Sequence, residues 1–324
     1  MKAAVYTRYG PPDVVLIKDV EKPVPNNNEV LLRIRAASVN PLDWHFMRGA
    51  PYILRIGAGL HKPKVTRLGV DLAGQVEAVG ANVTQFKPGD EVFGVCRGAL
   101  AEYACTVEQK LALKPANLSF EAAAAVPVAA ITALQGLRDK GRIQPGNKVV
   151  VDGASGGVGT FAVQIAKSFG AEVTAVCSTR NVNTARSLGA DHVIDYTREN
   201  FTKSGQRYDL ILAANAYHSI FDYRRALNPN GIYVMAGGGG VQILQSIFLG
   251  PFLSLLGSKR MRLIFANINQ KDLVFLKDLL EARKVVPVLD KRYPLSSAAG
   301  ALRYLEEGHA QGKVIITVNQ GNHT

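Results

Sequence analysis

Apolar residues follow two different patterns along the chain, one before and one after about residue 120. From residue 121 to about 270, short runs rich in β-branched residues alternate with segments of helical spacing. The strands predicted in this region are 148–152, 172–177, 192–196, 208–214, 231–236 and 262–266. Strands that alternate with helices favour an α/β fold with a doubly wound parallel sheet.

Residues 1–120 instead contain short segments in which apolar and polar residues alternate. Examples are EVLLRIRAASVN, GQVEAVG, DEVFGV and AEYACTV, and Gly and Pro separate them, which is typical of antiparallel barrels. A helix is predicted around 296–308, and the closing strand KVIITV should return to this first domain. We therefore expect a β-rich domain of residues 1–120, completed by 285–324, and a sheet domain of residues 121–284.

The segment 148–170, KVVVDGASGGVGTFAVQIAKSFG, joins a buried strand, a glycine-rich turn and an amphipathic helix. Gly156 lets the backbone approach a pyrophosphate, and Gly159 lets the helix pack closely on the strand. The free N–H groups at the start of the helix suit a negative charge. Ala154 departs from the usual first glycine, but the strand and helix on either side favour a dinucleotide site over an ordinary glycine turn.

The residues after the second strand indicate which dinucleotide binds. An NAD site usually has an acidic residue about 20 residues past the glycine turn, whereas this chain reads Ser178, Thr179, Arg180. Hydroxyls and a guanidinium suit a 2′-phosphate. The sequence predicts NADPH; in the alternative reading, Arg180 merely begins the next helix on a solvated face.

Composition adds a net charge of +12 without any long basic run. We interpret this charge as favouring solubility and attracting an anionic coenzyme, and the absence of an arginine-rich tract or aromatic-basic platform speaks against nucleic acid as a partner. Cys96, Cys105 and Cys177 show no disulfide pattern, and the N-terminus has no signal-peptide core. A cytoplasmic location is expected.

Residues 241–257, VQILQSIFLGPFLSLLG, are apolar but interrupted by Gln, Gly and Pro. The segment is too broken to span a bilayer, which needs about 20 mostly apolar residues. A buried helix pair or a dimer contact is the favoured interpretation. A lid over a substrate pocket and a peripheral membrane contact remain alternatives.

Several further strings match a known family. They are SVNPLDW at 38–44, GVDLAGQVEAVG at 69–80, FKPGDEVFG at 86–94, AAVPVAAITALQGL at 124–137 and LGADHVIDY at 188–196. With the glycine turn, the chain resembles the medium-chain dehydrogenase/reductase superfamily, in its quinone oxidoreductase or zeta-crystallin-like branch, near the organelle quinone and enone oxidoreductase homologues. The resemblance implies a Rossmann domain, a GroES-like β-barrel catalytic domain, an active site in the cleft between them and a homodimer through the edge of the Rossmann sheet.

Zinc-dependent relatives carry Cys where this chain has Asn40 and His where it has Val70, and their four closely spaced cysteines are missing here. We predict no metal. Without a Lewis acid, a conjugated acceptor is easier to reduce than an isolated ketone, because its carbonyl oxygen can take up the charge as an enolate. The predicted activity is NADPH-dependent reduction of quinones or of the C=C bond of α,β-unsaturated carbonyls. The alternatives are zinc-free reduction of other carbonyl compounds and a nucleotide-binding regulatory or RNA-binding role.

The resemblance also implies roles for individual residues. Asn40 and Tyr52 are the catalytic candidates, as donors to the substrate, and Asn40 would also contact the coenzyme. The other implied coenzyme residues are Thr132 beside the nicotinamide, Ser155, Gly156, Gly157 and Val158 at the pyrophosphate, Ser178, Thr179, Arg180 and Tyr196 around the 2′-phosphate, and Asn215 and Gly237 at strand ends. A turn-capping role for Asn40 and a core role for Tyr196 remain open. Asp43 is interpreted as a structural partner of its turn, and Lys313 as a surface lysine.

Overall fold

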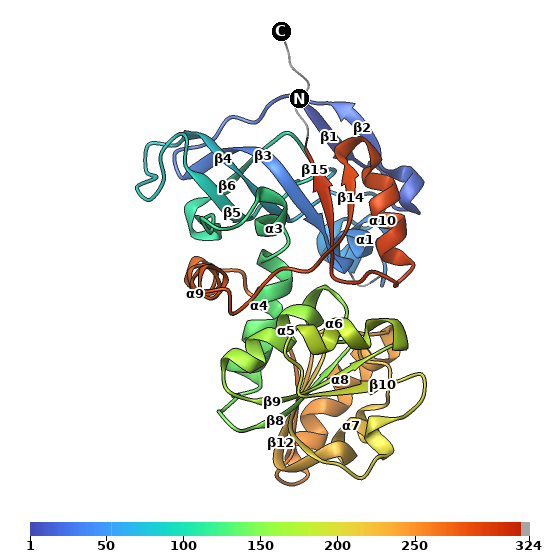
Figure 1. Ribbon diagram of the computed structural model, residues 1–324. Helices are drawn as coiled ribbons and strands as arrows, with labels where there is room; N and C mark the ends of the chain where they lie inside the picture. Colours follow the sequence, from blue (N-terminus) through green and yellow to red (C-terminus); the bar gives the residue numbers. More distant parts are fainter. Residues whose placement is uncertain (53, 319–324) are drawn as a thin grey trace. The chain divides into compact units, whose positions relative to one another are not determined.

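The computed structural model describes residues 1–52 and 54–318, and Figure 1 shows the course of the chain. These residues form two compact units. Unit 1 comprises Met1–Val128, Ile268–Glu281 and the described residues from Pro287 onward. Unit 2 comprises Ala129–Asn267 and Ala282–Val286.

This division differs from the expected domain boundaries at helix α9, Gln270–Glu281. The boundaries expected from the sequence include α9 in the sheet domain, whereas the structure packs it with unit 1. Two hydrogen bonds hold the segment there: Asn117 Nδ2 donates to Leu280 O at 2.9 Å, and Lys110 Nζ donates to Ile268 O. The chain therefore leaves the parallel sheet earlier than the sequence pattern indicated.

Unit 1 is built around the long strand β3, Glu29–Val39. On one side β3 pairs with β4, Asp71–Val79, and on the other it pairs first with β6, Tyr103–Val107, and then with β15, Lys313–Thr317. All three pairings are antiparallel. The remaining strands of the unit are β5 (Glu91–Val95), β7 (Leu111–Leu113), β14 (Leu289–Pro294) and the separate pair β1 (Lys2–Val5) and β2 (Leu16–Asp19). The expected β-barrel domain and the return of the closing strand to it are confirmed.

Alternation along β3 explains the core of unit 1. Val30, Leu32 and Ile34 are fully buried and belong to one apolar cluster that includes residues of β4, β5, β7 and β15. The described helices of this unit are α1 (Pro41–Arg48), α2 (Leu54–Ala58), α3 (Phe120–Ala124), α9 and α10 (Ala298–Glu306), and α4 (Pro127–Gln135) begins here and continues in unit 2. The last residue of β3, Val39, and the first residues of β4 and β15, Asp71 and Lys313, are all buried.

Unit 2 contains a six-stranded sheet in which every pairing is parallel. Its strands are β8 (Lys148–Asp152), β9 (Glu172–Cys177), β10 (His192–Asp195), β11 (Tyr208–Ala213), β12 (Leu227–Met235) and β13 (Arg260–Leu263). The order β10-β9-β8-β11-β12-β13 confirms the predicted doubly wound sheet. β12 and β13 begin earlier than expected, because the sequence pattern located the apolar centres of the strands and missed their polar starts.

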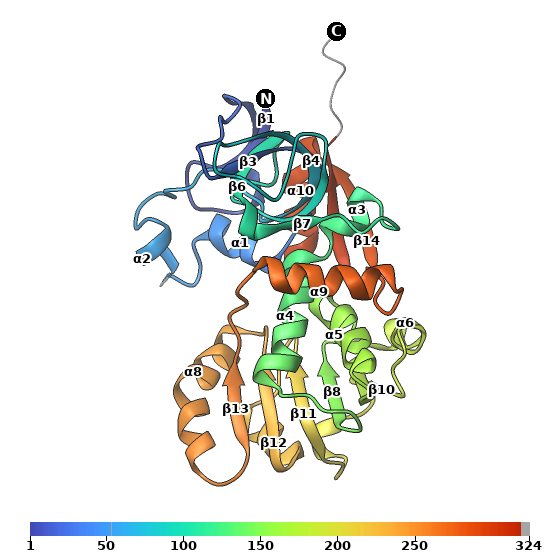
Figure 2. The ribbon, with the colours of Figure 1, turned by 90° about the vertical axis from the view of Figure 1, so that its left-hand side faces the viewer.

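The helices of unit 2 connect these strands. They are α5 (Gly157–Ser168), α6 (Val182–Ser187), α7 (Ile220–Ala226) and α8 (Gly240–Leu255). α7 and α8 cover part of one core, where Tyr223, Leu253 and Met261 are buried. Figure 2 shows α8 beside the edge strand β13.

Helix α8 corrects the interpretation of the apolar segment 241–257. The segment forms one helix that contains Pro251, so the buried helix pair is wrong. A row of its apolar side chains faces solvent: Val241, Leu244, Phe248, Phe252 and Leu255, with Phe248 71% exposed. Glutamine is a good helix former, and both glutamines bond to neighbouring backbone, Gln245 Oε1 accepting from Ile220 N at 3.1 Å and Gln242 Nε2 donating to Tyr217 O at 3.0 Å. The helix continues through Pro251, whose ring is exposed.

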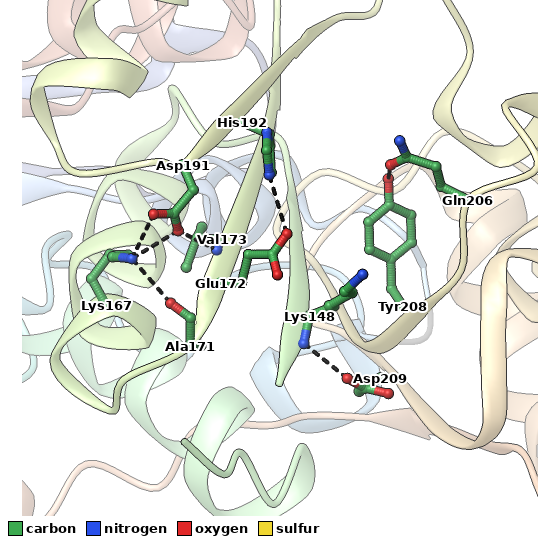
Figure 3. Close-up of polar contacts among 10 residues, drawn as sticks. All are labelled: Lys148, Lys167, Ala171, Glu172, Val173, Asp191, His192, Gln206, Tyr208 and Asp209. Atoms are coloured by element: carbon green, nitrogen blue, oxygen red, sulfur yellow. Dashed lines mark hydrogen bonds and ion pairs between the residues drawn. The ribbon is translucent and has the colours of Figure 1, made fainter. Parts of the chain in front are cut away.

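Polar side chains at the amino ends of the parallel strands pair with one another, as Figure 3 shows. Lys167 Nζ lies 2.7 Å from an Asp191 carboxylate oxygen, and that oxygen also accepts the Val173 N–H at 2.7 Å. His192 Nε2 lies 3.1 Å from Glu172 Oε1. The charges of Lys167 and Asp191 at this edge are therefore paired within the protein.

Candidate functional site

The carboxyl ends of the strands in unit 2 form a candidate site. The order of the sheet reverses at β8, because the chain goes first to β9 and β10 on one side and then to β11, β12 and β13 on the other. Open α/β sheets bind ligands outside the carboxyl ends at such a switch point. The turn from β8 into α5 lies at this position.

Two glycines of this turn differ in what a side chain would meet. A Cβ at Gly159 would come within 2.1 Å of Gly153 O, so the fold itself requires glycine there. A Cβ at Gly156 would meet only Gly153 O at 3.7 Å, an ordinary contact, and its φ of −80° suits any residue. Gly156 is the N-cap of α5, where free N–H groups and the helix dipole favour an anion. The space at Gly156 fits the close approach of a pyrophosphate.

The residues that follow β9 lie at the same edge. Ser178 caps a short 3₁₀ helix that contains the exposed residues Thr179 and Arg180. Thr179 Oγ1 donates to Asp195 Oδ2 at 2.5 Å, at the end of the neighbouring strand β10. The hydrogen bond from Thr179 lowers the pKa of Asp195 below its ordinary value. The hydroxyl of Thr179 is thus engaged with an acid that the sequence pattern did not single out.

Tyr196 directly follows β10, and half of it is exposed to solvent. Its ring lies 5.9 Å from that of Tyr217, which follows β11 and is also half exposed. The structure therefore does not bury Tyr196 as a core aromatic. Tyr217 was missed from the sequence, where the only signal was an aromatic residue shortly after an apolar strand.

The other predicted coenzyme residues of unit 2 are distributed along this edge. Asn215 is exposed after β11 and Gly237 is half-buried after β12, where Gly237 N donates to Ala213 O at 3.2 Å. Ser155, Gly157 and Val158 are partly accessible in the turn and first helical residues. Thr132 is buried on α4.

A buried acid lies directly beneath the glycine turn. Asp152, the last residue of β8, accepts a 2.6 Å hydrogen bond from Tyr223 Oη. Burial raises the pKa of Asp152 to about 7, although the Tyr223 bond opposes this shift. The hydrogen bond between Tyr223 and Asp152 anchors α7 to the end of β8, so we assign this pair a structural role.

Unit 1 contains a candidate site of its own, a buried polar network. Asn40 is 3% exposed, its Nδ2 donates to Asp71 Oδ2 at 2.9 Å, and its Oδ1 accepts from Lys313 Nζ at 2.5 Å. Asp71 also accepts from Ser38 Oγ at 2.8 Å and from Val128 N at 2.9 Å. The strands β3, β4 and β15 converge to bring these residues together.

This network corrects the interpretation of Lys313 as a surface lysine. Lys313 is 3% exposed, and its ammonium group lies 3.3 Å from Asp71 Oδ2. It was misread because a lysine that begins a strand is usually solvated, and its partners lie more than 240 residues away in the sequence. Asp71 and Ser38 were missed although both stand inside quoted family strings.

Asp43 supports the network from the start of α1. Its Oδ2 accepts the Asn40 N–H at 2.7 Å, which confirms its expected role as the partner of this turn. Burial raises the pKa of Asp43 to about 7, and nearby Asp71 adds to the rise.

Tyr52 does not join this buried network. Its ring is 76% exposed and lies under the guanidinium of Arg55, with 4.5 Å between Cζ and the ring centroid. His45 in α1 is held by a 2.8 Å contact from its Nδ1 to Ala50 O. The arrangement gives His45 a structural role and leaves Tyr52 at the surface of unit 1.

Two features are absent from the described residues. In residues 1–52 and 54–318, no group of three or more His, Cys, Asp or Glu side chains is placed to hold a metal ion. Within the same ranges, none of the helices combines the length and the apolar character needed to cross a membrane.

Comparison with family models gives two matches. Residues 26–116 match the alcohol dehydrogenase GroES-like domain, and residues 188–316 match the zinc-binding dehydrogenase family. The zinc in the second name belongs to the family model; this chain has Asn40 and Val70 at the positions where zinc-dependent members have ligands.

Relatives match over nearly the whole chain. The 2-methylene-furan-3-one reductase of Solanum lycopersicum is 38% identical, over 98% of this chain and 79% of its own length. The chloroplast envelope quinone oxidoreductase homolog of Arabidopsis thaliana is 35% identical over 98% of both chains. Among solved structures, the quinone oxidoreductase from Coxiella burnetii is similar with a TM-score of 0.87 and 28% identity, over 98% of this chain and 99% of the other.

The names of these relatives correct the expected cytoplasmic location. Several are designated chloroplastic, and an NAD(P)H oxidoreductase of Bos taurus that is 31% identical is designated mitochondrial. Cysteines without a disulfide pattern indicate a reducing environment, and they do not distinguish one reducing compartment from another.

Proposed function

This chain belongs to the medium-chain dehydrogenase/reductase superfamily, and from that premise we propose that it is an NADPH-dependent reductase of quinones or of conjugated C=C bonds in α,β-unsaturated carbonyls. The proposal assigns coenzyme binding to unit 2 and positioning of the acceptor to unit 1. The observation that carries it is the open space at Gly156, in a turn where the neighbouring Gly159 is required by packing alone.

The coenzyme fits the carboxyl edge of the sheet in unit 2. Backbone N–H groups at the start of α5 hold the pyrophosphate, and Gly156 leaves room for it. Ser178 and Arg180 face the 2′-phosphate in this proposal, and Tyr196 with Tyr217 flanks the adenosine. When bound, NADPH supplies a hydride from its nicotinamide ring.

The choice of NADPH over NADH rests on the strand end of β9. Ser178, Thr179 and Arg180 stand there with no acidic residue among them. A relative named NADPH-dependent alkenal/one oxidoreductase, from Arabidopsis thaliana, is 34% identical. An acidic residue in the place of Arg180 would repel a 2′-phosphate, whereas a guanidinium can pair with it. The Asp195 carboxylate also reaches this strand end, where it accepts a hydrogen bond from Thr179 and pairs with Arg198.

The residues of unit 1 suit an acceptor whose carbonyl oxygen gains negative charge during the reaction. Asn40 offers a neutral N–H donor in a buried environment, where a hydrogen bond is stronger than in water. As the β-carbon gains hydride, the electron pair of the C=C bond moves toward the carbonyl, and the oxygen becomes an enolate oxygen. Solvent then protonates the α-carbon, since Tyr52 is directed to solvent and Asp43 is bound within its own turn.

A panel of acceptors tests this function. We expect the purified protein to consume NADPH with quinones and with enals or enones, and to leave saturated aldehydes and ketones unreduced. Absorbance at the NADPH band gives the rates, and the same panel with NADH gives the coenzyme preference. Turnover of saturated carbonyls alone would contradict the proposal.

The proposal also includes a homodimer formed through the edge of the sheet in unit 2. β13 has a neighbour only on its β12 side among the described strands, and the exposed apolar row of α8 lies beside it. Burying this row removes apolar surface from water. Light scattering should give twice the chain mass, and Phe248→Ser with Phe252→Ser should give the monomer; binding to vesicles by a monomeric protein would favour a membrane contact instead.

A further inference from the structure

The buried network of unit 1 carries an inference that deepens the proposed function and rests on it. We propose that the Lys313–Asp71 ion pair fixes and polarises the Asn40 amide, so that its second Nδ2 hydrogen donates to the carbonyl oxygen of the conjugated acceptor. Lys313 acts through Asn40 and is a positioning residue.

The geometry leaves the Asn40 amide one orientation. Lys313 carries only donors and contacts Oδ1 at 2.5 Å, while Asp71 as a carboxylate carries only acceptors and receives Nδ2 at 2.9 Å. A flipped amide would face a donor with a donor and an acceptor with an acceptor. One hydrogen of Nδ2 is used by Asp71, and the other is available in a fixed direction.

Further hydrogen bonds hold Asp71 and Lys313 in place. Asp71 Oδ1 accepts from Val128 N at 2.9 Å, and Oδ2 accepts from Ser38 Oγ at 2.8 Å. Lys313 lies 3.4 Å from Val39 O. The side chains of Lys313 and Asp71 are 4% and 0% exposed, so neither can leave the network without exposing the other as an unpaired charge.

Stability alone is a poor explanation for this arrangement. A buried ion pair loses its hydration, and replacing such a pair by apolar residues is often neutral for folding. The pair does gain something else here: a cation bound to Oδ1 draws electron density from the amide, and hydrogen bonds in a chain strengthen one another at low dielectric. The remaining N–H of Asn40 becomes a better donor to an oxygen that gains negative charge.

The step balances without any group beyond the proposed reaction. Hydride adds to the β-carbon, the π electrons of the C=C bond form the enolate, and the Asn40 N–H stabilises its oxygen. The proton that completes the product reaches the α-carbon from solvent. Lys313 and Asp71 keep their charges throughout, so they contribute a fixed field and transfer nothing.

The test uses Lys313→Met and the double variant Lys313→Met/Asp71→Asn, which leaves no unpaired charge if the single variant fails to fold. We expect kcat for an enone to fall at least about tenfold, since a preorganised donor to an oxyanion is worth about 10²–10³ when removed outright. The Kd for NADPH should stay within about twofold, and a quinone, which delocalises charge over two carbonyls, should lose less. Lys313→Arg should recover part of the enone rate.

A matched control variant and a double-mutant cycle distinguish a positioning role of Lys313 from a purely structural one. Lys114 is also buried in unit 1, with its side chain 8% exposed and paired to Glu91, so Lys114→Met should lower the melting temperature and spare the enone-to-quinone ratio. In an Asn40→Ala background, Lys313→Met should change kcat no further. Additive losses, equal losses on both acceptors, or no loss would overturn the inference, whereas a wild-type protein that reduces neither acceptor would instead refute the proposed function.

Discussion

The same parallel strands of unit 2 form two edges, and the protein uses the polar groups of these edges differently. At the amino edge, Lys167 forms an ion pair with Asp191, and His192 Nε2 contacts Glu172 (Figure 3). At the carboxyl edge, Arg180 and Tyr196 face solvent, and the turn at Gly156 has room that no side chain fills.

Helix direction explains the contrast. Each helix that follows a parallel strand starts at the carboxyl edge, where its free N–H groups favour an anion, and ends near the amino edge, where carbonyls favour a cation. Lys167 lies in the last turn of α5 and supplies that cation from within the chain. No acidic side chain lies in the first turn of α5. In the proposed function the pyrophosphate of the coenzyme supplies the anion there.

The largest effect that tests this contrast is expected at Gly156. In Gly156→Val the side chain takes the space of the pyrophosphate, and the Kd for NADPH should rise about 100-fold, which corresponds to about 2.7 kcal/mol. The melting temperature should fall only modestly, because valine is a poorer N-cap than glycine but a Cβ there meets only an ordinary contact. Fluorescence titration and thermal unfolding measure both; unchanged affinity would mean that the coenzyme does not approach this turn.

The next largest effect is expected at Gly159, where glycine is needed for packing and not for the coenzyme. In Gly159→Ala the new Cβ would clash with Gly153 O at 2.1 Å, so we expect a loss of about 1–3 kcal/mol in the free energy of unfolding. Urea unfolding measures it. A fully stable Gly159→Ala variant would remove the distinction between a glycine kept for packing and one kept for the ligand.

A smaller effect is expected at Arg180. In Arg180→Ala the Kd for NADPH should rise about tenfold, or about 1.4 kcal/mol, as a phosphate loses its guanidinium partner. NADH affinity should remain as it was. Arg198→Ala provides a control at the same edge, since Arg198 pairs with Asp195. Equal losses of both coenzymes would place Arg180 away from the 2′-phosphate.

The smallest effect is expected at the amino edge. In Asp191→Asn the ion pair with Lys167 is lost, which costs about 0–1 kcal/mol for a pair this exposed, with no change in coenzyme affinity. Burial acts to raise the pKa of Asp191, but the hydrogen bonds from Lys167 and Val173 lower it below its ordinary 3.8. The stabilisation is therefore present above pH 3.8 and lost as pH falls below it. The unfolding curves of the wild type and of Asp191→Asn should converge in acid. Altered NADPH binding by Asp191→Asn would contradict the distinction between the amino and carboxyl edges.

The sequence predicted those parts of the molecule that depend on neighbouring residues. The turn at Gly156 lies between a strand and a helix within 23 residues, and the parallel sheet was expected from strands that alternate with helical segments. Asp71 and Lys313 could not be found in this way, because strands 242 residues apart bring them together. α8 was misjudged because its composition gave its apolar character but not which side of the helix would face solvent.

The most direct test of the account follows the hydride itself. NADPH carrying deuterium at the transferable position of C4 is turned over with an α,β-unsaturated ketone, and NMR locates the label in the product. The account predicts deuterium on the β-carbon and a solvent-derived proton on the α-carbon, with the carbonyl intact. Deuterium on the carbonyl carbon, giving an allylic alcohol, would contradict it.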